Sequence, residues 1–262
     1  MKVEKFKASV GGSVRKTRVP PPDIGRIKNI VEYHYGFVPK EADIEWIDRM
    51  YRNNYAVLHE HQIVRELAAK NMSDRLLKHR DRLGSAEFER IWREKTIINF
   101  LTFASMCFRA GVPAGAIGLC RTAIESGLRE KLAEETARKE ITGESKLSEA
   151  TLNNVKRLEN KPLRKLIKEA EERGIIKKQD IEEAFQALET EDQSGRRILN
   201  KFIHGDITWI VDYVKDRKDI GVMGAKDELE EYKIIFESEI DHIATEVLKA
   251  SYRIAEILYF TK

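Results

Sequence analysis

The fold is decided by residues 96–109, which read TIINFLTFASMCFR, and by residues 113–135 after them. The first stretch is apolar on nearly all sides of a helix, which is typical of a helix in the middle of a bundle. Gly111 suits the end of that helix, and Pro113 suits the first turn of the next one. In the second stretch apolar residues recur every three to four positions, at Ile117, Cys120, Ile124, Leu128 and Leu132. The two stretches therefore predict a helical hairpin.

Helical periodicity continues on both sides of this hairpin, and no stretch alternates in the manner of a strand. We expect the helix that contains residues 96–109 to begin at an N-cap formed by Ser85. The other predicted helices cover residues 23–35, 41–82, 147–159, 162–173, 180–190, about ten residues that end at His204 before Gly205, and 227–260. The sequence thus predicts an all-α fold.

The 262 residues are enough for one large domain or two small ones. We expect a basic arm and linker at 1–22, a helical extension at 23–95, and a helical bundle at 96–262 that ends in a long helix. Apolar residues in that last helix recur close to a heptad spacing. The helix could pack inside the monomer or against a second copy.

The net charge of +3, from 47 Lys and Arg against 44 Asp and Glu, is too small to indicate a nucleic-acid binder. Residues 1–18 are more basic, with six Lys or Arg and one Glu. Such an arm could attract phosphate backbones or could be a solvated terminus. Abundant Lys and Glu with only four Gln is similar to the surface composition of thermophilic proteins.

Several classes of protein are disfavoured. The longest uncharged run, residues 96–108, is shorter than the ~18 to 20 residues that cross a bilayer, so we expect a cytoplasmic protein without a membrane partner. Cys107 and Cys120 lie within apolar helical pattern, which favours buried thiols over a disulfide or a zinc site. His59 and His61 would point about 200° apart on a helix and cannot share one metal ion. We find no motif for a cofactor or a metal.

Residues 195–205, which read GRRILNKFIHG, place polar side chains at helical intervals. Seen from His204, Arg197 lies about 20° away, Asn200 about 40° and Arg196 about 80°. Ile198, Leu199, Phe202 and Ile203 lie on the opposite side and would face a core. His204 would sit at the helix C-terminus, where the carbonyl dipoles favour a protonated ring and hence a proton donor. In the alternative, the Arg residues pair with surface acids such as Glu191 and Asp192, and His204 only caps the last carbonyls.

Arg121 and Glu125 form a second pair of interest on the predicted helix 113–135. At this spacing they could form an ion pair, or Glu125 could reach across the bundle to hold Arg196 or Arg197.

Three features together resemble the HEPN superfamily of helical domains associated with nucleotides and RNA. They are the Asn200-x-x-x-His204-Gly205 ending, an Arg seven or eight residues before the His, and the upstream pattern Ala116-x-x-x-x-Arg121-x-x-x-Glu125. The resemblance covers roughly residues 96–215 and is strongest to a poorly characterised branch often found with prokaryotic defence and restriction proteins. It implies a HEPN-like helical bundle that pairs as a homodimer around a cleft.

Active members of this superfamily are metal-independent endoribonucleases, some of them toxins or antiviral effectors. The resemblance implies that His204 is the acid/base, that Arg197 or Arg196 clamps the phosphate, and that Asn200 orients the substrate. In the commonest active form an Arg directly precedes the Asn, and Leu199 occupies that position here. The expected partners are RNA or a nucleotide and an antitoxin or other defence-system protein. The alternatives are a non-catalytic dimeric scaffold and a module that binds RNA or a nucleotide without cleavage.

Overall fold

The computed structural model describes residues 25, 27–29, 32, 38–45, 60–140, 144–188, 199 and 228–261. Throughout these residues the chain forms helices and turns and no strand, which confirms the all-α prediction. The basic arm and linker at 1–22 and the polar residues of the segment that ends at His204 lie outside the described residues. In this part of the chain, no helix combines the length and apolar character needed to span a membrane.

From α3 to η1 the helices follow one another along the chain with short connections, and residues 189–227, of which only Leu199 is described, separate η1 from α13. They are α3 (Glu60–Leu77), α4 (Arg80–Leu83), α5 (Ser85–Glu94), α6 (Thr96–Arg109), α7 (Pro113–Glu140), α8 (Glu144–Leu158), α9 (Leu163–Glu172), α10 (Lys178–Phe185), the 3₁₀ turn η1 (Gln186–Leu188) and α13 (Glu228–Tyr259).

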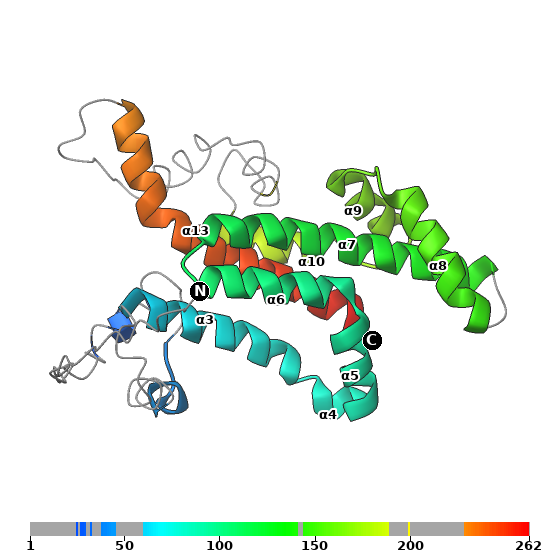
Figure 1. Ribbon diagram of the computed structural model, residues 1–262, viewed down its shortest axis with the longest axis horizontal. Coiled ribbons are helices and arrows are strands. Elements are labelled where there is room, and N and C mark those ends of the chain that lie inside the picture. The colour runs from blue at the N-terminus through cyan, green and yellow to red at the C-terminus, as the bar shows by residue number, and fades with distance from the viewer. Residues whose placement is uncertain are drawn as a thin grey trace, which may run out of the picture.

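The predicted hairpin is the centre of the fold (Figure 1). α6 and α7 lie side by side, α13 packs against both, and α3 packs against α6 and α13. α8 and α9 pack on α7, and α10 packs on α13. Buried residues of α3 and α5, such as Leu67 and Phe88, belong to one continuous core with those of α6, α7 and α13.

The hairpin turn depends on Gly111. Its φ of 77° is in the left-handed region, and Gly111 N–H donates to Phe108 O at 3.0 Å while Val112 N–H donates to Cys107 O at 2.8 Å. These two bonds form a Schellman motif, which satisfies carbonyls that the end of α6 would otherwise leave open. The expectation that Gly111 ends one helix and Pro113 begins the next is confirmed.

The long helix expected from Ser85 to Arg109 is wrong, because the chain breaks at Lys95. Lys95 adopts an extended conformation (φ −79°, ψ 121°) between α5 and α6. Thr96 N–H, at the start of α6, donates to Glu130 Oε2 on α7 at 3.1 Å. Ser85 is not an N-cap either: Gly84 holds that position, and no side chain caps the helix.

The helix expected over 41–82 is also interrupted. α3 ends at Leu77, and Lys78 and His79 form a turn before α4. Other boundaries shift less: α7 continues to Glu140, and α8 begins at Glu144 rather than 147. The last helix agrees with the prediction, since α13 runs over Glu228–Tyr259.

The apolar seam of α13 packs inside the monomer over the residues described. Ile243, Val247 and Ile254 are fully buried, and the helix contacts α3, α6, α7 and α10. Of the two alternatives for this seam, packing within one chain is therefore the one observed from Ile240 onward.

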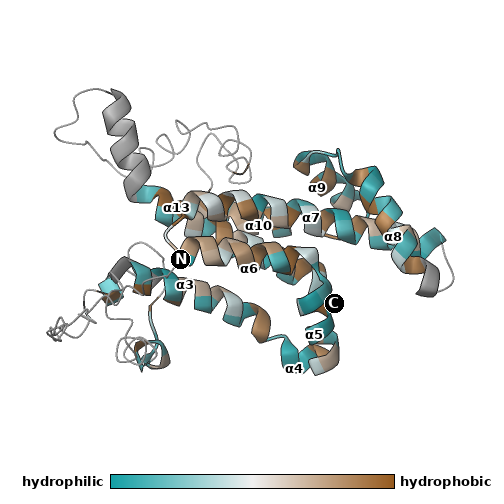
Figure 2. Ribbon diagram, in the orientation of Figure 1, coloured by the Kyte–Doolittle hydropathy of each residue, from teal (hydrophilic) through white to brown (hydrophobic). Residues whose placement is uncertain are grey.

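Figure 2 shows that α6 is mostly apolar along its length. Contrary to the expectation for so apolar a helix, α6 is not enclosed on all sides. Leu101, Ala104 and Phe108 are buried, whereas Phe103 and Met106 are each 55% exposed. The thiols also differ from expectation in part, because Cys120 is buried but Cys107 is only half-buried; both are free.

Candidate functional site

The predicted pair Arg121 and Glu125 lies on α7 and forms an ion pair. Arg121 Nε donates to Glu125 Oε1 at 3.0 Å, and the other carboxylate oxygen accepts from Arg129 NH2 at 3.4 Å. All three side chains are about four-fifths buried. Each is spaced four residues from the next, so one helix face presents two guanidinium groups around one carboxylate.

Leu199 is the one residue of the predicted motif helix that the structure describes. It is helical and only 1% exposed, as expected for the apolar side of that helix. Its carbonyl oxygen accepts a long hydrogen bond of 3.4 Å from Arg121 NH1. The motif segment therefore lies against the charged face of α7 at this residue.

The polar candidates His204, Arg197, Arg196 and Asn200 lie outside the described residues, and so does His59. Of the predicted site, the structure describes the supporting pair, Arg121 and Glu125, and it places this pair against the backbone of Leu199. Arg129 connects this pair to the neighbouring helices. Its NH2, which contacts Glu125, also donates to Lys161 O in the α8–α9 connection at 3.3 Å.

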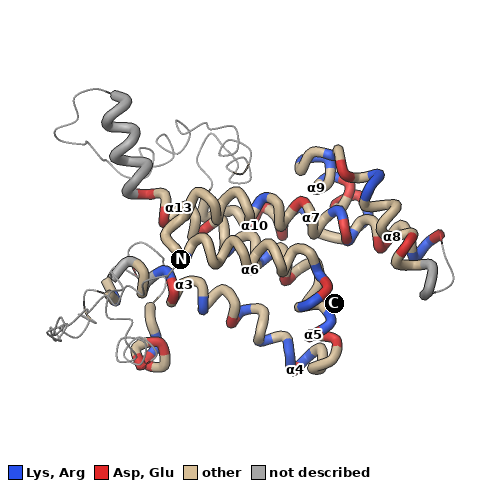
Figure 3. The backbone as a smooth tube through the Cα atoms, viewed as in Figure 1, with Lys and Arg blue, Asp and Glu red and all other residues tan. Residues whose placement is uncertain are grey.

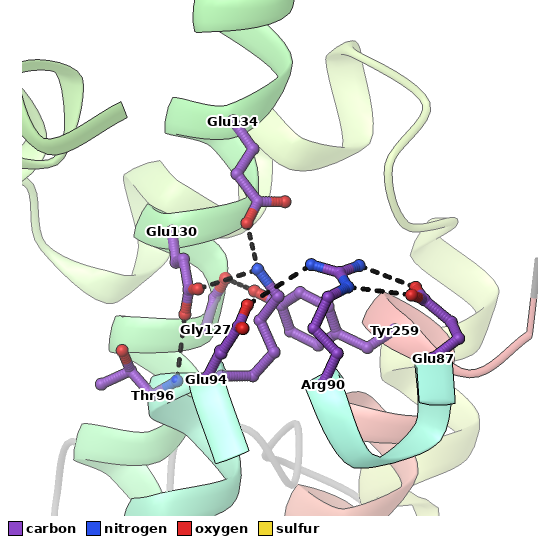
Figure 4. A network of polar contacts seen from close by, with 9 residues as sticks. Glu87, Arg90, Glu94, Thr96, Gly127, Glu130, Glu134 and Tyr259 are labelled. Atoms are coloured by element: carbon purple, nitrogen blue, oxygen red, sulfur yellow. Dashed lines mark hydrogen bonds and ion pairs between the residues drawn. The ribbon is translucent and has the colours of Figure 1, made fainter. Parts of the chain in front are cut away.

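Sequence reasoning missed a network at the break between α5 and α6 (Figure 4). Lys95 Nζ contacts Glu130 Oε1 at 3.0 Å and also bonds Glu134, while its side chain is only 8% exposed. The ammonium lies 5.3 Å from the centre of the Tyr259 ring, and Tyr259 OH donates to Gly127 O at 3.1 Å. The only hint in the sequence was the pair of glutamates one helical turn apart on α7.

Electrostatics explain how this network tolerates burial. Burial alone would lower the pKa of Lys95, but the hydrogen bond to Glu134 and the charges of Glu130 and Glu134 raise it above the ordinary value. Burial, with the same two carboxylates, raises the pKa of the Tyr259 hydroxyl. Lys95, Glu130 and Glu134 pair with one another, and Glu130 also accepts from Thr96 N–H. The network therefore fixes the start of α6 against α7.

A cavity of about 910 Å³ opens beside the network, between α5, α7 and α8. Its wall carries both signs of charge, including Glu94, Arg129, Arg138 and Lys156. Among the residues described, no group of three His, Cys, Asp or Glu side chains is placed to hold a metal ion.

A third polar cluster ties α3 and α4 to α13 through Glu256. Arg75 Nε and Arg253 NH1 each lie 2.8 Å from Glu256 Oε2, and His79 Nε2 lies 2.6 Å from Oε1. Burial would raise the pKa of Glu256, but bonds from Arg253, His79 and Arg75 lower it to about 2. Arg82 NH2 lies 3.1 Å from His79 Nδ1, and because Arg cannot accept, Nδ1 accepts and Nε2–H donates to Glu256.

We compared the chain with models of known protein families, with curated proteins and with solved structures, and none of the three comparisons finds a match.

Proposed function

We propose that this chain is a HEPN-like, metal-independent endoribonuclease of a toxin or antiviral defence system, with RNA as its substrate. The proposal rests on the Arg/Asn/His pattern of residues 196–204 and is supported by one contact, the hydrogen bond from Arg121 to the Leu199 carbonyl. That contact joins the α7 guanidinium face to the segment that carries the acid/base candidate.

In the proposed reaction the ribose 2′-hydroxyl gives its proton to a solvent water molecule and attacks the adjacent phosphorus. The O2′–P bond forms and the P–O5′ bond breaks, which leaves a 2′,3′-cyclic phosphate on one product. His204 donates a proton to the departing 5′-oxygen. Arg197, or Arg196, pairs with the charged phosphate oxygens, and Asn200 orients the substrate by hydrogen bonding.

Arg197 and His204 are seven residues apart, which is about 10.5 Å along a helix. If the segment is the helix that the sequence predicts, the two side chains would be too far apart to touch and could grip a phosphodiester between them. In a homodimer, which is part of the proposal, residues of a partner subunit would face the same cleft.

A second candidate function is favoured by the burial of Leu199. This position carries an Arg in the commonest active form, yet here it is 1% exposed and faces the core. A chain that lacks that guanidinium could bind RNA or a nucleotide without cleaving it, or serve as a dimeric scaffold.

The test separates the two candidates. Purified protein is incubated with mixed RNA in EDTA, beside the double variant Arg196→Ala/Arg197→Ala, which removes both clamp candidates, and the control Arg93→Ala, which removes an exposed Arg on α5. Under the nuclease proposal, wild type and Arg93→Ala cleave equally and the double variant does not. RNA binding without cleavage in all three samples would support the second candidate instead.

A further inference from the structure

Three arginines from three helices meet around the single carboxylate of Glu256. Arg75 lies in the last turn of α3, Arg82 on α4 and Arg253 on α13. Arg75 Nε and Arg253 NH1 each donate to the same oxygen, Glu256 Oε2, at 2.8 Å. Arg82 joins them through His79, which binds Arg82 NH2 on one side and Glu256 Oε1 on the other. We call Arg75, Arg82 and Arg253 the arginine cluster.

The arginine cluster carries more positive charge than its one acid neutralises. The three guanidinium groups carry +3 and Glu256 carries −1. His79 adds no charge in this arrangement, because its Nδ1 accepts the hydrogen bond from Arg82 and therefore holds no proton. A surplus of +2 is left.

Nearby acids do not offset this surplus. Asp74 forms an ion pair with a lysine of its own helix at 2.7 Å, and Glu89 lies 3.7 Å from Arg80. Asp81 is exposed on α4, and the charge of exposed Lys78 balances it. Figure 3 shows Lys and Arg gathered at the corner where α3 ends and α4 begins.

The donors of the arginine cluster are accessible to a ligand. The side chains of Arg75 and Arg253 are 44% and 33% exposed, and Arg82 is exposed as well. Each guanidinium has five N–H donors, and the contacts with Glu256 and His79 use one nitrogen of each. Among the described residues, the other guanidinium nitrogens have no partner. Glu256 is only 9% exposed, so solvent meets the guanidinium groups rather than the carboxylate.

We propose that the arginine cluster binds a phosphate monoester. Such a group carries about −2 charge near neutral pH, which matches the surplus, and it presents three acceptor oxygens. Guanidinium groups form paired, charge-assisted hydrogen bonds with phosphate oxygens. Glu256 and His79 hold the three side chains in place before a ligand arrives, which reduces the entropy lost on binding.

Two sources present this same group, a small phosphorylated molecule and the 5′-phosphate at the end of an RNA. The first is independent of the proposed function. The second rests on it and adds a contact with the RNA substrate away from the residues proposed for cleavage.

Isothermal titration calorimetry of the full chain at about pH 8 tests the proposal, with methyl phosphate as the doubly charged probe and dimethyl phosphate as the singly charged comparison. Wild type should bind methyl phosphate at one site and dimethyl phosphate at least about tenfold more weakly. Arg82→Gln should weaken methyl phosphate binding at least about tenfold, because it removes charge-assisted hydrogen bonds. Arg80→Gln is the matched control: it makes the same charge change on the same helix, but Arg80 pairs with Glu89, so binding should change by less than about twofold.

Circular dichroism checks that each variant keeps its helix content. Arg82→Lys repeats the test if Arg82→Gln fails to fold, since it keeps the charge and removes the fork of donors. A wild type without saturable methyl phosphate binding would overturn the proposal. Equal weakening by Arg80→Gln and Arg82→Gln would overturn it too, because that result indicates general attraction to a basic surface.

A short 2′-O-methyl RNA with and without a 5′-phosphate separates the two sources. Tighter binding of the phosphorylated form that is lost in Arg82→Gln identifies an RNA end as the ligand. Equal binding of the two forms, beside Arg82-dependent binding of methyl phosphate, identifies a small phosphorylated molecule. The methylated 2′-oxygens cannot attack phosphorus, so neither result depends on RNA cleavage.

Discussion

Arg121 donates a hydrogen bond to the carbonyl oxygen of Leu199, a residue 78 positions later in the sequence, over 3.4 Å. The same guanidinium pairs with Glu125 on its own helix. One side chain therefore pairs with a mostly buried carboxylate and also contacts the backbone at Leu199. The proposed site depends on this connection, because the acid/base candidate follows Leu199 by five residues.

Arg121→Ala should lower the free energy of unfolding by about 1 to 3 kcal/mol, because it removes charge-assisted hydrogen bonds from a mostly buried carboxylate. Urea unfolding measures the change. Arg138→Ala is the control, since Arg138 is an exposed residue of the same helix. Equal unfolding midpoints for the two variants would contradict the role given to Arg121.

Lys95→Met should destabilise the protein by about 2 to 4 kcal/mol, because Glu130 and Glu134 would keep their charges without the ammonium between them. Lys168→Ala serves as the comparison and should change stability by less than about 0.5 kcal/mol, since its ion pair with Glu172 is exposed. If thermal unfolding finds similar losses for both, the Lys95 network does not stabilise the α5–α6 break.

The low pKa of Glu256 predicts that the free energy of unfolding decreases in acid. Its pKa is about 2 in the folded protein against 4.5 for the ordinary group, so its contribution is present above about pH 4.5 and is lost as the pH falls toward 2. The shift corresponds to at most about 3 kcal/mol. Urea unfolding at several pH values should show wild type losing stability in this window and approaching Glu256→Gln, which is less stable at pH 7. Parallel curves for the two proteins would contradict the assignment.

Two glycines of α7 should respond in opposite directions to alanine. A Cβ on buried Gly127 would lie 2.8 Å from Ile97 Cδ1, so Gly127→Ala should cost about 1 to 3 kcal/mol. A Cβ on Gly118 would meet nothing within 4 Å, so Gly118→Ala should gain up to about 1 kcal/mol from helix propensity. A melting temperature of Gly127→Ala at or above that of wild type would show that the α6–α7 contact is looser than described.

Local patterns in the sequence were sufficient to predict the α6–α7 hairpin and the last helix, α13. Gly111 and Pro113 mark the turn because a positive φ and a first-turn proline are backbone requirements that individual residue types meet. The apolar period of α13 is equally local. The ion pair of Arg121 and Glu125 followed from a spacing of four residues on one helix.

What the sequence could not predict depends on partners far along the chain. α6 begins where Glu130, a residue of the next helix, accepts Thr96 N–H. The turn after α3 contains His79, which is held by Glu256 from the other end of the chain. Phe103 is exposed because the helices that pack on α6 contact other sides of it. Hydrophobic periodicity does not specify which side of so apolar a helix its neighbours cover.

The most direct test of the central proposal compares wild type with His204→Ala in an RNA cleavage assay in EDTA, with the product ends analysed. The account predicts that wild type leaves 2′,3′-cyclic phosphate ends and that His204→Ala, at unchanged helix content, makes no products. Equal cleavage by the two proteins would contradict the assignment of His204 as the proton donor.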